Sequence, residues 1–390
     1  MKLEKNSISS KDLVFSVFCF MHATVLRSGY IVGITRQDSW AMTITGLLFS
    51  LPLIAIYAAL LNMFPGRNLF EIDDLVFGPI PGKIVSALYL FFFVSLAALN
   101  LRDLGNFVVD YLMPGTPTAV IFLLFLIGCA YGLSKGIKNL MYLSTLICIV
   151  SLTSLAVNFI LVLGDVDPGF LKPFFQLEPA KYVQATVSVG AVPLGEIIAF
   201  TMLTPMLGEK TKATKPLLLG ASLSALSMTV VILRDIMTLG PLVAIVSLPS
   251  FESVRYISLS GVLTRLESIY AVILILLFLF KISILIYAFA LGLTQMMNRE
   301  SRLPPAIHSD NKLCETEQVP HKKHYPPLLL LSTALVFFYS LFVFESVMEN
   351  MDWGATTAPF FSLTFEFLLP AVTLLTAGLR KLATPREAAT

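Results

Sequence analysis

The stretch SVGAVPLGEIIAF, residues 188–200, decides the fold expected of this chain. It lies in an apolar run long enough to cross a membrane as a plain helix, yet it carries Gly190, Pro193, Gly195 and a carboxylate, Glu196, at its middle. Proline lacks a backbone donor and clashes with the preceding helical turn. Within a bilayer, a helix break is tolerated only where the freed backbone groups face protein or water. The stretch therefore predicts a helix that unwinds near its centre beside a polar cavity.

The composition is typical of a membrane protein. Of the 390 residues, 56% are hydrophobic and 13% are charged, and the mean hydropathy is +0.82, whereas a soluble domain carries about 25% charged residues. The net charge of +2 gives no reason to expect a nucleic-acid partner. The four cysteines show neither pairing nor metal-ligand spacing, so we expect no disulfide framework, metal or cofactor. We expect a single membrane domain, residues 1–390, within the lipid bilayer.

Apolar runs between Pro, Gly and charged residues predict ten transmembrane helices, since each crossing needs about 20 apolar residues. The expected fold class is therefore all-α and integral to the membrane. The segment 240–261 is also apolar enough to form a short re-entrant or interfacial helix. The predicted spans are 12–34, 41–63, 84–108, 117–134, 139–163, 182–206, 216–238, 266–292, 327–347 and 358–380.

The distribution of Lys and Arg predicts the orientation of these spans. With a cytoplasmic N-terminus, 18 of the 27 basic residues fall in inside segments and four in outside loops. Positive residues accumulate on the cytoplasmic side of membrane proteins. We therefore expect both termini to be cytoplasmic. Arg234 and Asp235, near the outer end of span seven, are expected to anchor the interface by snorkelling.

The interruption in span six has a counterpart. Ten spans divide into two repeats of five, 12–163 and 182–380, and span six then corresponds to span one, where Arg27, Ser28 and Gly29 interrupt the apolar run. Matching breaks in two halves indicate an inverted-repeat transporter fold with a binding site near the midplane. The alternative is that both helices are simply kinked for packing.

Two broken helices would form a site for a small zwitterion. Exposed half-helix N-termini attract a carboxylate, and freed carbonyls attract an ammonium group. An amino acid carries both groups. The predicted ligand-binding residues are Arg27, Ser28, Gly29, Gly190, Pro193, Gly195 and Glu196.

Lys281 lies inside span eight between two strongly apolar stretches. A lone ammonium group at this depth needs a partner. Glu196 and Glu366, in span ten, are the available carboxylates. Lys281 is therefore predicted either to form a structural charge pair, with Glu366 as one candidate partner, or to act as a charge relay or a substitute for a coupling ion.

Three stretches resemble the B subunits of spore germinant receptors, a branch of the amino acid–polyamine–organocation superfamily. They are WAMTITGLLFSLPLIAIYAALLNMFPGRNLFEI (40–72), PLGEIIAF (193–200) and SLSGVLTRLESIYAVILILLFLFKISILIYAFALGL (258–293). The resemblance implies a ten-helix LeuT-like fold with discontinuous helices one and six. It also implies a small, amino acid-like germinant, an A-type membrane subunit and a C-type lipoprotein as partners, and the spore inner membrane as location.

The first break departs from the pattern of the family it resembles. Arg27 stands where a glycine is expected, and Ile34 where a proline is expected. A guanidinium group in the site would pair with Glu196 in the empty state or bind an acidic ligand.

Two functions fit these observations, and neither is enzymatic. The sequence contains no phosphate-binding Gly-rich loop, no H-E-x-x-H and no G-x-S-x-G motif. The first function is a germinant-receptor B subunit that binds a small ligand at the midplane and signals to partner subunits to trigger germination. The second is an amino acid or polyamine transporter with ion- or proton-coupled flux.

Overall fold

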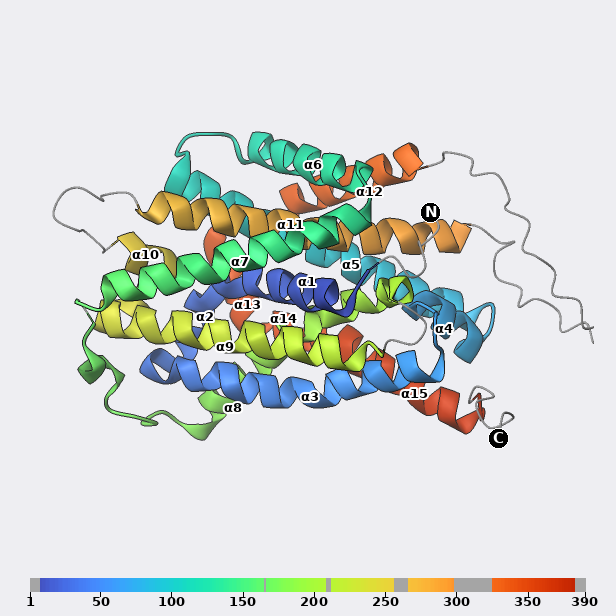
Figure 1. The fold of residues 1–390 in the computed structure, drawn as a ribbon, viewed down its shortest axis with the longest axis horizontal. Coiled ribbons are helices and arrows are strands. Elements are labelled where there is room, and N and C mark those ends of the chain that lie inside the picture. Colours follow the sequence, from blue (N-terminus) through green and yellow to red (C-terminus); the bar gives the residue numbers. More distant parts are fainter. Residues whose placement is uncertain (1–7, 165, 208–211, 256–265, 298–324, 383–390) are drawn as a thin grey trace, which may run out of the picture.

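The computed structural model describes residues 8–164, 166–207, 212–255, 266–297 and 325–382. These residues are nearly all helical, and Figure 1 shows most of the helices running side by side along one long axis. The only β contact in the described ranges is an isolated bridge between Ile8 and Leu207. The α-helices are α1 (Ser10–His22), α2 (Ser28–Thr35), α3 (Ser39–Met63), α4 (Leu69–Phe77), α5 (Pro81–Phe107), α6 (Thr118–Ser134), α7 (Ile137–Val162), α8 (Pro179–Ala191), α9 (Thr214–Leu239), α10 (Pro249–Arg255), α11 (Leu266–Met297), α12 (Tyr325–Phe342), α13 (Val347–Thr356), α14 (Ala358–Leu363) and α15 (Leu369–Leu379).

Each of the ten predicted runs is helical, but three of them are divided. The first run holds α1, the 3₁₀ turn η1 (Ala23–Arg27) and α2, and the sixth holds α8 and the 3₁₀ helix η5 (Gly195–Met202). The tenth is divided by a π turn, η9 (Thr364–Leu368). The two predicted discontinuities are therefore present. The π turn in the tenth run was not expected.

By length and composition, seven described helical segments are long and apolar enough to cross a membrane, and a bent pair makes an eighth. The bent pair is the end of α12 with α13, which meet at 100°. Helix α6 is apolar but shorter. A count of ten crossings, and the repeat boundaries at 12–163 and 182–380, remain predictions.

Local sequence determines where several helices begin. At Asn68, the side-chain oxygen accepts the Glu71 backbone N–H at 3.0 Å, and the Glu71 carboxylate accepts the Asn68 N–H at 3.1 Å. The pair is a capping box, which satisfies two backbone donors at the start of a helix. Ser9 and Asp12 form the same arrangement at the start of α1. The short helix expected within 240–261 is present as α10.

Helix α1 lies at the centre of the bundle, with α7 and α9 on either side (Figure 1). Its apolar side chains from Val17 to Met21 are fully buried. By contrast, large apolar side chains on α6 and α7, such as Leu124 and Leu146, are mostly exposed. An apolar exterior is expected where lipid is the solvent. The chain is an integral membrane protein.

Close helix packing depends on a few glycines. A Cβ at Gly46 in α3 would lie 2.6 Å from a methyl carbon of Val189 in α8, whereas a Cβ at Gly128 in α6 would lie 3.8 Å from its nearest neighbour, Leu279. We predict that Gly46→Ala lowers the stability of the detergent-solubilised protein by about 1–3 kcal/mol through overpacking. Gly128→Ala should leave stability unchanged or raise it. Thermal unfolding measures both, and equal melting temperatures would contradict the packing of α3 on α8.

Candidate functional site

The first helix break is a short 3₁₀ turn that contacts α11 on one side and the loop before α10 on the other. The α-helix α1 ends at His22, the 3₁₀ turn η1 follows, and the chain then continues as α2. Within the break, the buried Thr24 side chain faces α11. On the other side, a Cβ at Gly29 would overlap the carbonyl oxygen of Ser247, so Gly29 permits close approach of the loop before α10. The structure describes the backbone of Arg27 but not its side chain.

The second break follows from the missing donor of Pro193. In a regular helix that residue would donate to the carbonyl of Val189. Here the next residue, Leu194, donates to it instead at 3.4 Å, and the chain continues as the 3₁₀ helix η5. Gly190 fits against α3, where a Cβ would overlap Phe49. The proline and glycines therefore shape the break and contribute no side-chain chemistry.

Lys281 connects the two breaks. Its Nζ lies 2.5 Å from Oε2 of Glu196 in the second break, and it donates to Oγ1 of Thr24 in the first break at 2.6 Å. The ammonium group also lies 5.0 Å from the ring centre of Phe20, which packs edge-on against Phe200. Lys281 is fully buried and Glu196 nearly so. One cation thus holds two discontinuous helices together in a region shielded from solvent.

A second carboxylate, Glu366, lies beside this ion pair. Its side chain is fully buried, close enough to Glu196 and Lys281 to interact electrostatically, and neither of its oxygens has a hydrogen-bond partner among the described residues. It packs on Gly195, where any Cβ would overlap the carboxylate. The site therefore contains two carboxylates and one ammonium group.

The π turn at Glu366 has a local cause. Pro370, four residues on, has no N–H for the Glu366 carbonyl, so that carbonyl lacks its helical donor. The hydroxyl of Tyr57 in α3 donates to it at 2.5 Å. Single π turns occur frequently at functional sites. Here the turn positions the Glu366 carboxylate against the second break.

The structure brings together part of the predicted set. Gly195, Glu196, Lys281 and Glu366 share one buried cluster, which we call the central site. Ser28 and Gly29 face the α10 loop instead. Sequence reasoning missed Thr24, Phe20 and Tyr57. Thr24 could have been found as the polar residue inside the first break, but nothing in the sequence indicated Tyr57, because its contact depends on how α3 packs.

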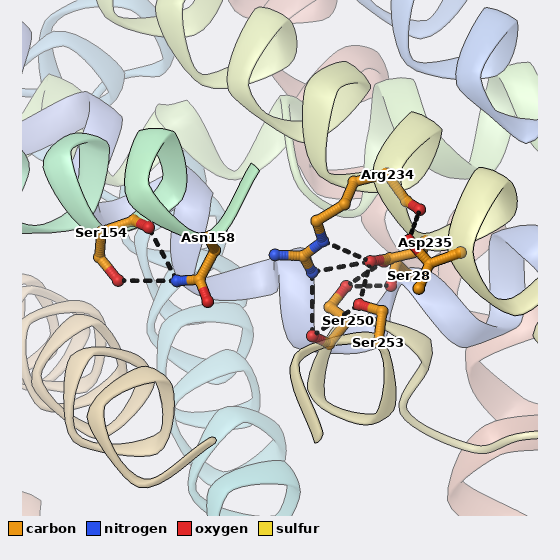
Figure 2. Close-up of polar contacts among 8 residues, drawn as sticks. Ser28, Ser154, Asn158, Arg234, Asp235, Ser250 and Ser253 are labelled. Atoms are coloured by element: carbon orange, nitrogen blue, oxygen red, sulfur yellow. Dashed lines mark hydrogen bonds and ion pairs between the residues drawn. The ribbon is translucent and has the colours of Figure 1, made fainter. Parts of the chain in front are cut away.

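A separate polar cluster involves Ser28 (Figure 2). Its hydroxyl is 3.0 Å from that of Ser250 in α10, and the hydroxyls of Ser250 and Ser253 both donate to the Asp235 carboxylate, at 2.7 and 2.6 Å. Asp235 also pairs with Arg234 at 2.7 Å. The predicted snorkelling of Arg234 and Asp235 is wrong, since both side chains are completely buried. These hydroxyl donors come from α10, which folds back over α9 and closes the pair off from solvent.

No group of His, Cys, Asp or Glu in the described part of the chain is arranged to hold a metal ion. The central site combines the Lys281 ammonium group, the carboxyl groups of Glu196 and Glu366, and the hydroxyl group of Thr24.

Comparison with known proteins identifies the family. A family described as spore germination protein matches residues 7–303. The chain belongs to this family. It is 24% identical to spore germination protein KB of Bacillus subtilis over 97% of this chain and 96% of that protein. It is 23% identical to spore germination protein B2 of the same organism, over 58% of this chain and 61% of that protein.

Solved structures show the same fold in transporters. Mhp1, a nucleobase-cation-symport-1 family transporter in a closed conformation, aligns with a TM-score of 0.64 at 12% identity, over 97% of this chain and 80% of that one. A Na⁺-coupled sialic acid symporter aligns with a TM-score of 0.60 at 10% identity, over 93% of this chain and 80% of that one. The fold is LeuT-like. The family to which the chain belongs is one of germination proteins and not of enzymes.

The contact between Gly195 and Glu366 can be tested with a matched glycine. We predict that Gly195→Ala displaces the Glu366 carboxylate and destabilises the protein by about 1–3 kcal/mol. The control is Gly33→Ala in α2, where a Cβ would meet nothing within 4 Å. That variant should be neutral or stabilising by up to about 1 kcal/mol. Thermal unfolding in detergent compares them, and a Gly195→Ala protein as stable as Gly33→Ala would contradict the placement of Glu366.

Proposed function

We propose that this chain is the B subunit of a spore germinant receptor, and that the central site binds a small amino acid-like germinant. The observation that carries the proposal is the Lys281 ammonium group, which joins Thr24 of the first break to Glu196 of the second. A ligand that competes for this cation acts on both discontinuous helices at once.

The charges of the central site complement a zwitterion. The ligand carboxylate would take the place of Glu196 at Lys281, and the ligand ammonium group would bind between Glu196 and Glu366. This exchange replaces one buried ion pair by two, and it compensates the second carboxylate. A ligand shifts a conformational equilibrium only through its different affinities for the two states. Replacement of the Lys281–Glu196 ion pair by the ligand gives such a difference in affinity, because the ion pair and the bound ligand compete for the same charged groups.

The receptor proposal includes partners and a location. The family assignment supports an A-type membrane subunit and a C-type lipoprotein as partners that detect the change, with the spore inner membrane as the location. The asymmetry of Lys and Arg supports cytoplasmic termini. A receptor subunit needs no net flux, since its output is the altered contact with its partners.

Amino acid or polyamine transport is the second candidate, and the symporter fold favours it. An uptake assay distinguishes the receptor from the transporter. The chain alone is reconstituted in liposomes and supplied with radiolabelled amino acids under an imposed proton or sodium gradient. The receptor proposal predicts binding without accumulation above the level of empty liposomes. Gradient-driven accumulation by the chain alone would overturn it in favour of transport.

The ion pair provides a direct test of signalling. We predict that Lys281→Met abolishes the response of spores to a mixture of the standard amino acids, measured as the fall in optical density. The single change also leaves buried carboxylates uncompensated, which costs about 3–5 kcal/mol. Lys135→Met, at an exposed cation at the end of α6, should respond as the parent protein does.

A double variant separates stability from signalling. Lys281→Met with Glu196→Gln removes both charges of the pair, so it should recover most of the stability lost in the single variant. It should remain unresponsive, because the ligand has lost its partners. A stable, well-expressed double variant with a full response would refute the role of the central site.

A further inference from the structure

A pocket of about 290 Å³ lies away from the central site, between α2, the last turns of α5, the loop before α10, and α13. It is near the end of the bundle where α10 lies, opposite the end that holds α4 and α15 (Figure 1). Its volume is near the lower end of the range of about 300–1,000 Å³ found for small-molecule pockets. We call it the aromatic–acidic pocket, after its lining residues Tyr30, Asp103, Asn106, Phe107, Asp110 and Tyr111.

The lining carries negative charge. Asp103 and Asp110 are its charged residues, and no Lys or Arg is among the described residues that line it. Asp103 is only 8% exposed, and the side-chain amide of Asn350 in α13 donates to it at 2.7 Å, which fixes the carboxylate in place.

Two described basic side chains next to the lining, Arg102 and Arg255, already interact with carboxylates. Arg102 interacts with Glu349 as well as with Asp103, and Arg255 pairs with Glu252 at 3.2 Å. Asp110 lines the pocket and is exposed. The pocket therefore attracts cations and repels a free carboxylate.

The aromatic walls favour an organic cation over a metal ion. Phe107 and Tyr111 both pack edge-on against Phe251 of α10, with ring centres 5.3 Å apart in each case, so their rings are held rigidly. The π turn η3 (Val108–Leu112) ends α5 and places Asp110 and Tyr111 on the pocket. Ammonium groups bind the faces of such rings.

The side-chain amide of Asn106 gives the pocket a hydrogen-bond donor. The side-chain nitrogen of Asn106 is buried, and it has no hydrogen-bond partner among the residues that the structure describes. A buried donor without a partner is costly. A ligand with a hydroxyl oxygen would accept this donor while its ammonium group lies against the carboxylates.

We propose that the aromatic–acidic pocket binds a small organic ammonium ion that carries a hydroxyl group and no carboxylate. This ligand class differs from the zwitterion proposed for the central site, and the inference does not depend on that proposal. A receptor or transporter with this pocket recognises an amino alcohol at one end of its helical bundle.

The test compares three two-carbon ligands that differ in charge: ethanolamine, glycine and glycolate. Isothermal titration of the full chain in lipid nanodiscs should show ethanolamine binding at least about tenfold more tightly than glycolate, because one carries an ammonium group and the other a carboxylate. Glycine should be intermediate at this pocket. Glycolate binding as tightly as ethanolamine, or no ethanolamine binding at all, would overturn the proposal.

Variants assign the binding to the pocket. Asp110→Asn alters an exposed side chain, so the protein should fold normally while ethanolamine binds about tenfold more weakly. Tyr111→Leu should weaken it several-fold by removing an aromatic face. The control is Glu178→Gln, an exposed carboxylate at the start of α8 with no capping hydrogen bond, which should leave the affinity unchanged. Glu366→Gln in the central site should also leave it unchanged. Equal affinities in Asp110→Asn and the control would overturn the proposal.

Discussion

A single ammonium group joins the two broken helices of this protein. Lys281 lies between the Thr24 hydroxyl and the Glu196 carboxylate, which belong to two different broken helices. An isolated charge at this depth would be too costly to keep. Because each partner comes from a break, the cost is offset only when both discontinuous segments meet at α11. The ammonium group lies over the ring of Phe20, and the Glu366 carboxylate packs on Gly195 beside it.

The backbone around the central site obeys a second constraint, set by prolines. Pro193 and Pro370 each remove a donor from a helix, and in each case the freed carbonyl accepts another donor. The N–H of Leu194 donates to the carbonyl of Val189, and the Tyr57 hydroxyl donates to the carbonyl of Glu366. In both places the regular α-helix is interrupted next to a carboxylate. The result is a buried site in which one ammonium group and two carboxyl groups from three different helical segments lie together.

Much of this architecture could be predicted from the sequence, because it depends on properties of single residues. Proline and glycine mark the second break, and a lysine inside an apolar span demands a carboxylate, so Glu196 and Glu366 could be named as its candidates. The choice between them depends on which side chain the breaks bring within reach of α11. The sequence does not indicate how far each carboxylate lies from the Lys281 ammonium group. Tyr57 was missed for the same reason, since its partner is a carbonyl group exposed by a proline more than 300 residues away.

The error at Arg234 and Asp235 shows the same limit. Charges near the end of a predicted span normally reach the interface, but α10 folds back and supplies two serine hydroxyls to Asp235. Depth along a helix could be estimated from the sequence, and a short helix after α9 could be expected, whereas the way α10 packs back over Asp235 could not be predicted. Ser28 was assigned to the ligand site from its place in the break, yet its side chain belongs to this second cluster.

The central claim is that Lys281 and Glu196 form a direct ion pair between the two breaks. Solid-state NMR of the full chain in lipid bilayers, with ¹⁵N-lysine and ¹³C-glutamate labels, measures this contact. The account predicts a dipolar cross-peak between the Lys281 side-chain nitrogen and the Glu196 carboxylate carbon, assigned by its disappearance in Lys281→Arg and in Glu196→Gln. A Lys281 resonance that shows no contact with Glu196 and exchanges freely with water would contradict it.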